Sequence, residues 1–142
     1  HDEQSAGKLC GFAGAKLKIQ YGEDGLDELT TTGASYVAEL KNGTVTTFTV
    51  SPADAGLPMA KPEDLKGGSP EVNAQAIRDL LAGKTGAYRD IVLFNAAAAL
   101  IVAGKTTDLK VGVEMAAQAI DGGALSAIRF GTEGWGSRLD PA

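Results

Sequence analysis

The chain has 142 residues, 44% of them hydrophobic, which is enough for one domain with a buried core. Its net charge of −5 and isoelectric point near 4.8 argue against a nucleic-acid partner, because phosphates require a basic face. Cys10 is the single cysteine, which excludes an intrachain disulfide and favours a reducing, cytoplasmic location.

The first half of the chain predicts strands. Alternating apolar and polar residues predict a strand over residues 17–21. Two further strands are expected over 35–40 and 44–50, joined as a hairpin through Lys41-Asn42-Gly43, because Asn-Gly tolerates the positive φ of a type I′ turn. The threonine-rich strand over 44–50 indicates a face that is open to water.

An acidic loop, residues 22–29, lies between the first two predicted strands. It reads Gly22-Glu23-Asp24-Gly25-Leu26-Asp27-Glu28-Leu29, with four acids in six residues. Carboxylates repel one another, so such a group indicates a hard cation, a cationic partner or simple solvation on an exposed loop. The spacing is not that of an EF-hand. The loop alone leaves these alternatives open.

Residues 51–68 are rich in proline and glycine and predict an irregular connector, with short helical turns at 52–55 and 62–65. Ser69 is expected to cap a helix that ends at Gly83. The apolar stripe of this helix consists of Val72, Ala76, Ile77, Leu80 and Leu81. The turn Lys66-Gly67-Gly68-Ser69 either holds an anion at the helix N-terminus or is a plain loop-to-helix turn.

The most apolar segment predicts a buried helix over residues 89–103, shorter than the ~20 residues of a membrane span. Its small residues 96–99 allow close approach of a neighbouring backbone. Asn95 needs a hydrogen-bond partner; pinning of a nearby loop is its expected role, with ligand contact as the alternative. A last helix is expected after the capping residues 106–108, ending at Gly122, with its core stripe at Leu109, Val113, Ala116 and Ile120.

Four segments, in this order, resemble the anthranilate phosphoribosyltransferases. They are the acidic loop, Gly67-Gly68-Ser69-Pro70-Glu71-Val72-Asn73, Leu80-Leu81-Ala82-Gly83-Lys84 and Arg89-Asp90-Ile91-Val92-Leu93-Phe94-Asn95-Ala96-Ala97-Ala98-Ala99-Leu100. The likeness runs from about Ala15 to about Ile128 and corresponds to the C-terminal portion of that family. It divides the chain into an unmatched segment 1–14, a phosphoribosyltransferase-like α/β domain 15–130 and an unmatched glycine-rich tail 131–142.

The resemblance implies an α/β fold, α+β-like in chain order: a partial mixed sheet with a β-hairpin, packed by three C-terminal helices. It also implies that Asp27 and Glu28 bind Mg²⁺ together with phosphoribosyl pyrophosphate, a role that suits an ion which takes one or two carboxylates plus phosphates. Asp24 is expected to support this pair, and Glu23 to be solvated. Tyr21 stands where the family typically carries histidine, and tyrosine does not titrate near neutrality.

The implied function is transfer of phosphoribose from phosphoribosyl pyrophosphate to anthranilate, in tryptophan synthesis. The chain contains neither the family's Gly-Thr-Gly-Gly-Asp donor loop nor its Lys-His-Gly-Asn segment, and its single histidine is His1. The first residue is also not methionine, so we expect a processed or partial chain that is inactive alone and has no catalytic residue of its own.

Two alternatives remain: a free-standing non-catalytic binding or assembly domain derived from the family, and activity through a complementing chain. Truncation of the sheet would expose strand edges and apolar helix faces, so we expect a homo-oligomer. No membrane partner is expected, because the acidic, polar start carries no secretory signal.

Overall fold

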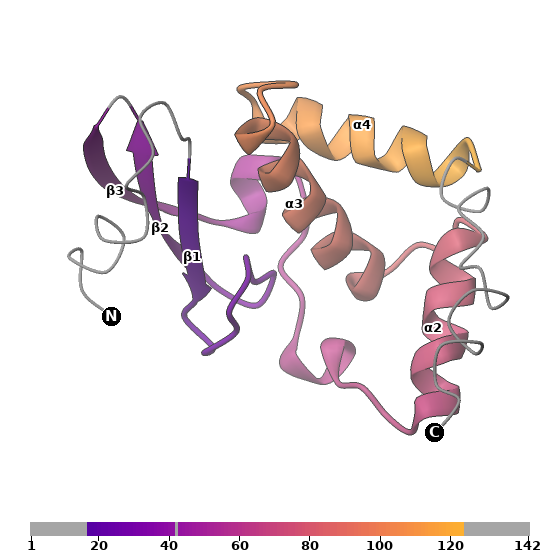
Figure 1. Cartoon of the computed structure of the whole chain (residues 1–142). Coiled ribbons are helices and arrows are strands. Elements are labelled where there is room, and N and C mark those ends of the chain that lie inside the picture. The colour runs from indigo at the N-terminus through magenta and orange to yellow at the C-terminus, as the bar shows by residue number, and fades with distance from the viewer. Residues whose placement is uncertain (1–16, 42, 124–142) are drawn as a thin grey trace, which may run out of the picture.

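The computed structural model describes residues 17–41 and 43–123, and of residues 17–19 the backbone alone. Three strands come first: β1 (Leu17–Gly22), β2 (Ser35–Lys41) and β3 (Thr44–Val50). Two short 3₁₀ turns follow, η1 (Pro52–Ala55) and η2 (Pro62–Leu65), and then the helices α2 (Pro70–Leu81), α3 (Ala87–Val102) and α4 (Leu109–Asp121). The sheet lies to one side of the helices, and α3 lies between the sheet and α2 (Figure 1).

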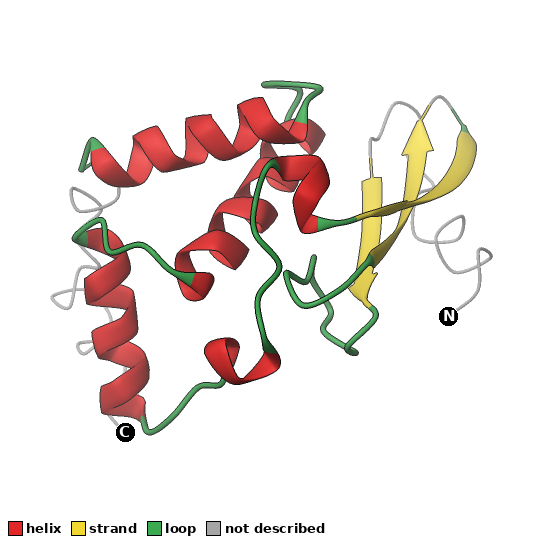
Figure 2. Ribbon diagram, turned by 180° about the vertical axis from the view of Figure 1, so that it is seen from behind, coloured by secondary structure: helices red, strands yellow, loops and turns green. Residues whose placement is uncertain are grey.

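The sheet has the order β1-β2-β3, and both strand pairs are antiparallel. The β2–β3 hairpin turns at Gly43, whose φ of 78° is the left-handed conformation predicted for this turn; Asn42 lies outside the described residues. All four threonines of β3 are exposed, as its composition indicated. The expected α/β class, with a hairpin followed by three helices, is confirmed (Figure 2).

Two buried clusters form the core, and α3 contributes to both. The first joins the end of the acidic loop to the sheet, η1 and α3, through Leu29, Val37, Ala55, Phe94 and Ala98. The second joins the three helices through Leu80, Leu93, Ala116 and Ile120. Because its apolar side chains face both clusters, α3 is buried on opposite sides, which agrees with its nearly continuous apolar sequence.

The helix boundaries follow the predicted capping residues, with one shift. The Ser69 side chain accepts a hydrogen bond from the Val72 N–H at the start of α2, and Asp108 accepts from two N–H groups at the start of α4. Helix α3 begins at Ala87, two residues earlier than expected, because Gly86 adopts a φ of 136° and its carbonyl accepts the first helical bond, from the Asp90 N–H.

The apolar stripe predicted for α2 is only partly buried. Leu80 is buried against α3 and α4, whereas Val72 is 59% exposed and Ile77 is 46% exposed. Figure 1 shows that α2 reaches the other helices with its C-terminal end, and that its N-terminal half projects away from them. Among the described residues, none of the helices has the length and apolar character that crossing a membrane requires.

Candidate functional site

The acidic loop is closed by backbone hydrogen bonds. The Gly22 N–H donates to the Leu26 carbonyl at 2.8 Å, and the Glu23 N–H donates to the Ala34 carbonyl at 2.9 Å. Gly22 leaves no room for a side chain, since a Cβ at this position would lie 2.9 Å from the Cβ of Thr30. Gly25 has a φ of 91°, which favours glycine. The loop therefore has a defined path, although its four acids are exposed.

Asp24 accepts hydrogen bonds that stabilise the acidic loop. Its Oδ2 accepts hydrogen bonds from the hydroxyls of Thr30 at 2.5 Å and Thr32 at 2.6 Å, and its Oδ1 accepts from the Leu26 N–H at 3.2 Å. Partial burial acts to raise the pKa of Asp24, but these hydrogen bonds to the ionised form outweigh it, so the pKa lies below its ordinary value of 3.8. Asp24 thus stabilises the loop that carries Asp27 and Glu28.

Asn95 of α3 holds the other end of the loop. Its Oδ1 accepts from the Leu29 N–H at 2.9 Å, and its Nδ2 donates to the Leu29 carbonyl at 2.8 Å. The Nδ2 also donates to the Ile91 carbonyl at 3.0 Å, and Gln20 Nε2 donates to Oδ1 at 3.3 Å. The prediction that Asn95 pins a nearby loop is confirmed, and the pinned residue directly follows Glu28.

Asp27 and Glu28 border an open groove of about 700 Å³ beside α3. Both are exposed, and neither carboxylate has a hydrogen-bond or ion-pair partner within residues 17–41 and 43–123. The opposite wall is one face of α3, and the groove is completed by Gln20, Asn95, Ala98, Ala99, Val102 and Ala103. The structure therefore brings the two predicted metal ligands together at one groove.

Two carboxylates do not enclose a cation by themselves. The described part of the chain holds no group of three or more His, Cys, Asp or Glu side chains that could bind a metal ion. Mg²⁺ takes six oxygen ligands and usually keeps several waters, with one or two carboxylates and substrate phosphates supplying the rest. A pair of free carboxylates at an open groove fits this mode of binding, and it does not fit a closed structural metal site.

Tyr21 has a structural partner. Its ring stacks on the ring of Tyr36, the opposite residue of β2, with centroids 5.1 Å apart and an interplanar angle of 23°. Such cross-strand aromatic pairs stabilise antiparallel strands.

Glu23, in the acidic loop, is exposed, as expected, and has no hydrogen-bond or ion-pair partner in the described ranges.

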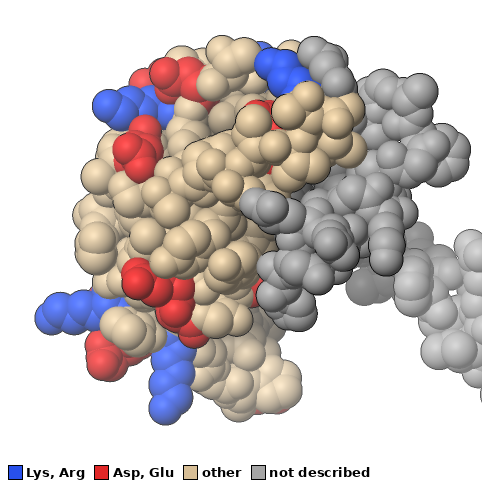
Figure 3. Space-filling model, turned by 90° about the vertical axis from the view of Figure 1, so that its left-hand side faces the viewer, with Lys and Arg blue, Asp and Glu red and all other residues tan. Residues whose placement is uncertain are grey.

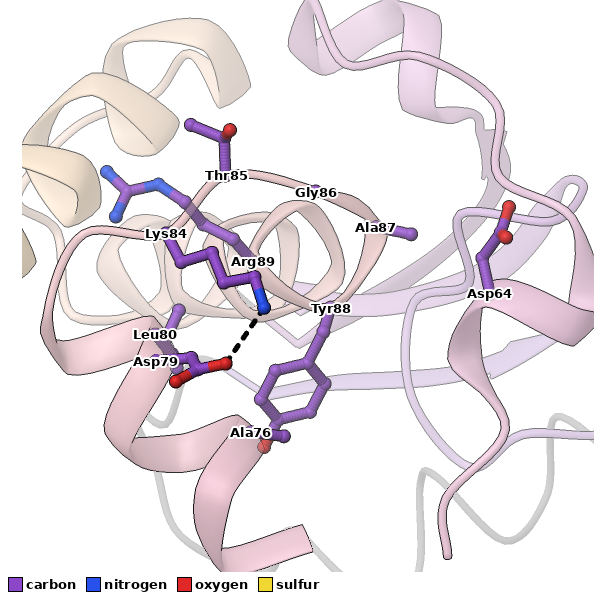
Figure 4. A pocket seen from close by; sticks show the side chains of 10 residues that line it. All are labelled: Asp64, Ala76, Asp79, Leu80, Lys84, Thr85, Gly86, Ala87, Tyr88 and Arg89. Atoms are coloured by element: carbon purple, nitrogen blue, oxygen red, sulfur yellow. Dashed lines mark hydrogen bonds and ion pairs between the residues drawn. The ribbon is translucent and has the colours of Figure 1, made fainter. Parts of the chain in front are cut away.

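A second hollow, of about 210 Å³, lies between α2, η2 and the start of α3 (Figure 4). Two of its charged groups pair with each other: Lys84 Nζ lies 2.9 Å from Asp79 Oδ2, and Gln75 donates to the other oxygen of Asp79. The Arg89 guanidinium extends away from Tyr88 toward α4, where it pairs with Asp121 at 2.9 Å. One Arg89 nitrogen, Nη1, is buried without a hydrogen-bond partner among the described residues, and the hollow holds no pair of unpartnered carboxylates like that of the groove.

The turn at residues 66–69 forms a helix cap. The Gly68 N–H donates to Asn73 Oδ1 at 2.9 Å, and the Asn73 amide returns a bond to the Gly68 carbonyl at 3.1 Å. The Ser69 hydroxyl also lowers the pKa of Glu71, an acid in the first turn, by hydrogen bonding to it. Groups that an anion would need are thus used within the turn, which favours the plain loop-to-helix interpretation.

The charges on the face of the molecule drawn in Figure 3 are mixed in sign. Lys and Arg side chains are separated from one another there, with Asp and Glu side chains between them. The described residues drawn on this face form no basic stripe of the kind that tracks a phosphate backbone.

Comparison with known proteins identifies relatives. The model of the glycosyl transferase family, a/b domain, matches residues 8–126. The anthranilate phosphoribosyltransferase of Parvibaculum lavamentivorans is 65% identical over 106 residues, which are 75% of this chain and 31% of that protein. The Rhodospirillum rubrum enzyme is 61% identical over 118 residues, 82% of this chain and 34% of that protein. The chain spans about a third of the length of these relatives.

Solved structures give the same result. The anthranilate phosphoribosyltransferase from Thermus thermophilus matches with a TM-score of 0.70 and 38% identity, over 80% of this chain and 33% of that chain. The Saccharomyces cerevisiae enzyme, solved in complex with PRPP (phosphoribosyl pyrophosphate) and Mg, matches with a TM-score of 0.71 and 25% identity, over 79% and 33%. The resemblance inferred from the four sequence segments is confirmed, and the family match begins at residue 8, ahead of Ala15.

Proposed function

Because the chain belongs to the glycosyl transferase family that includes the anthranilate phosphoribosyltransferases, we propose that it is the C-terminal part of such an enzyme. In this role it contributes one half of the donor site, the half that meets the magnesium and pyrophosphate of phosphoribosyl pyrophosphate. The complete enzyme transfers phosphoribose to the amino group of anthranilate.

The observation that carries this proposal is the state of the two carboxylates. Asp27 and Glu28 are exposed, have no partner among the described residues, and lie on a loop whose path is fixed at both ends. They border the 700 Å³ groove. Two unpaired carboxylates repel each other, so a site that keeps them adjacent favours a cation. When bound there with the donor, Mg²⁺ supplies positive charge that stabilises the departing pyrophosphate.

The residues of this chain bind and orient the magnesium-bound donor. Asp27 and Glu28 provide oxygen ligands, and the α3 residues Ala98 and Ala99 leave the groove wide because their side chains are small. Transfer needs no covalent enzyme intermediate, so positioning and charge account for most of the rate enhancement.

The chain by itself is proposed to be inactive. Its 142 residues include neither the glycine-rich donor loop nor the Lys-His-Gly-Asn segment of the family, and it covers about a third of its relatives' length. A half-site of two carboxylates can retain the magnesium-bound donor but cannot also place anthranilate for attack on it.

A second candidate function is a non-catalytic binding or assembly domain. The exposed apolar side chains of Tyr21, Tyr36, Val72 and Ile77 favour it, because such side chains mark surfaces that other proteins cover. A complementing chain would use the same surfaces, and it would restore activity as well.

Co-expression separates these possibilities. The chain is produced alone and together with the remaining two thirds of the Rhodospirillum rubrum enzyme, and phosphoribosyl anthranilate formation is measured. Half-site function predicts product only in the co-expressed sample, and its loss when Asp27→Asn and Glu28→Gln are combined. A soluble complex that forms no product would instead support the non-catalytic domain.

A further inference from the structure

The side chain of Asn95 and the backbone of Leu29 are joined by two hydrogen bonds of 2.9 and 2.8 Å, one in each direction. From this geometry we propose that Asn95 is a positioning residue, which sets where Asp27 and Glu28 stand at the groove. The functional part of this inference rests on the proposed cation-binding role of that pair.

The primary amide is the group that this contact requires. Its oxygen accepts from the Leu29 N–H while its nitrogen donates to the Leu29 carbonyl, as a neighbouring strand would do. The second amide proton reaches the Ile91 carbonyl one turn earlier in α3, which fixes the rotamer of the side chain. Gln20 of β1 donates to the same oxygen. The hydrogen bonds of the Asn95 amide with Leu29, Ile91 and Gln20, called the clamp below, thus join β1, the acidic loop and α3.

Leu29 transmits this constraint to the acidic pair because it directly follows Glu28. Its side chain is 1% exposed and lies in the core cluster with Phe94. At the other end of the pair, the Leu26 carbonyl is held by the Gly22 N–H at 2.8 Å. Asp27 and Glu28 are the two residues between these fixed points, and they have no side-chain partners of their own in the described part of the chain.

The backbone hydrogen bonds at Leu26 and Leu29 must therefore hold Asp27 and Glu28 in position, because no side-chain contact of the described residues does so. Two adjacent carboxylates with no partner repel each other and would separate on a free loop. Removal of a residue that orients a metal ligand by hydrogen bonding typically lowers the metal affinity by roughly 10–100-fold. Asn95 also lines the groove itself, so its hydrogen bonds to Leu29 lie beside the same groove as the carboxylates.

The test uses the full 142-residue chain and two variants of the clamp. Asn95→Ala removes the amide, and Asn95→Leu removes it while keeping a similar volume. Leu100→Ala is the matched control, because it weakens the same helix at the second core cluster, away from the acidic loop. Amide hydrogen exchange and amide chemical shifts report the loop by NMR, and Mn²⁺ serves as the metal probe by electron paramagnetic resonance.

Positioning predicts faster exchange of the Leu29 amide, displaced Asp27 and Glu28 amide signals, and at least roughly tenfold weaker Mn²⁺ binding in both Asn95 variants. The Leu100→Ala variant should change none of the three. Unchanged Leu29 exchange in the Asn95 variants, or Mn²⁺ affinity equal to that of the wild type, would overturn the inference.

The two proposals fail in different ways. If the wild-type chain binds no Mn²⁺, the proposed half-site is wrong, and the clamp is then judged by the NMR readouts alone. Displaced Asp27 and Glu28 signals in the Asn95 variants would still support positioning, and unmoved signals would overturn it.

Discussion

The side chain of Leu29 lies in the same buried cluster as that of Phe94, so the residue after the acidic pair is part of the core. Leu29 is 1% exposed and Phe94 is fully buried. The acidic loop is thus anchored by an apolar side chain as well as by the Asn95 amide. The position of the exposed acids Asp27 and Glu28 therefore depends on the burial of the neighbouring Leu29 side chain.

The first prediction concerns this anchor. Leu29→Ala removes a buried side chain and leaves a cavity, so we expect the free energy of unfolding to fall by about 2–5 kcal/mol. Chemical denaturation measures the loss. Leu26→Ala is the control, because Leu26 belongs to the same loop but is 36% exposed, and a change within about 0.5 kcal/mol is expected. Equal losses in the two variants would show that Leu29 is not an anchor.

Gly112 of α4 packs directly against Ala97 of α3. A Cβ built on Gly112 would lie 2.8 Å from the Cβ of Ala97 and 3.0 Å from its Cα. The predicted close approach at the small residues of α3 is confirmed here, with α4 as the neighbouring backbone. Both residues are buried, so the contact has no space into which it can relax.

The second prediction follows from this contact. In a free helix, replacement of glycine by alanine stabilises by about 1 kcal/mol, but overpacking of a close contact costs about 1–3 kcal/mol. Because the clash involves backbone atoms of α3, we expect Gly112→Ala to lower the melting temperature. Gln118→Ala, at an exposed position of α4, should leave it nearly unchanged. A more stable Gly112→Ala variant would contradict this packing.

The third prediction concerns acid stability. The pKa of Asp24 is lowered on folding, so its ionised form stabilises the protein above the ordinary value of 3.8, and this contribution disappears as the pH falls through the lower folded pKa. Asp24→Asn should therefore melt below the wild type at neutral pH, and the difference should shrink as the pH falls below 3.8. Thermal melts at several pH values measure it.

Thr32→Val provides the control for Asp24. It removes one of the two hydroxyl donors to Oδ2, so we expect the same pH dependence with a smaller difference from the wild type. A difference that stays constant or grows toward acid pH in either variant would show that the charge of Asp24 does not stabilise the loop.

The fourth prediction is self-association. Val72 and Ile77 are exposed on α2, and Tyr21 and Tyr36 are exposed on the sheet. Exposed apolar groups of this kind favour association, so we expect a dimer or larger oligomer in light scattering. Val72→Glu combined with Ile77→Lys should reduce its mass if α2 forms the contact. A monodisperse wild-type monomer would contradict the prediction.

Much of the fold could be predicted from local sequence signals. Each of three local signals determines a turn or a helix start by short-range hydrogen bonding or a restricted φ: Gly43, Ser69-Pro70 and the capping Asp108. The predicted elements follow these signals closely. The exposure of Val72 and Ile77 could not be predicted, because the periodicity of α2 shows which face is apolar but not which helices lie near it.

The candidate site, like the fold, could be predicted only in part. Its carboxylates Asp27 and Glu28 were identified by resemblance, and a polar Asn95 in an apolar helix indicated a buried hydrogen-bond partner. That this partner is the backbone of Leu29, and that Asp24 bonds to Thr30 and Thr32, depends on long-range and turn geometry that no spacing encodes. The stacking of Tyr21 on Tyr36 likewise required the strand register.

Calorimetric titration with phosphoribosyl pyrophosphate, in the presence and absence of Mg²⁺, tests the central claim most directly. It compares the wild-type chain, the combined Asp27→Asn and Glu28→Gln variant, and Glu23→Gln as a control from the same loop, after thermal melts show that all three are folded. The half-site predicts binding that requires Mg²⁺, is lost in the double variant and is retained in Glu23→Gln. No binding by the wild type, or equal binding by the double variant, would contradict it.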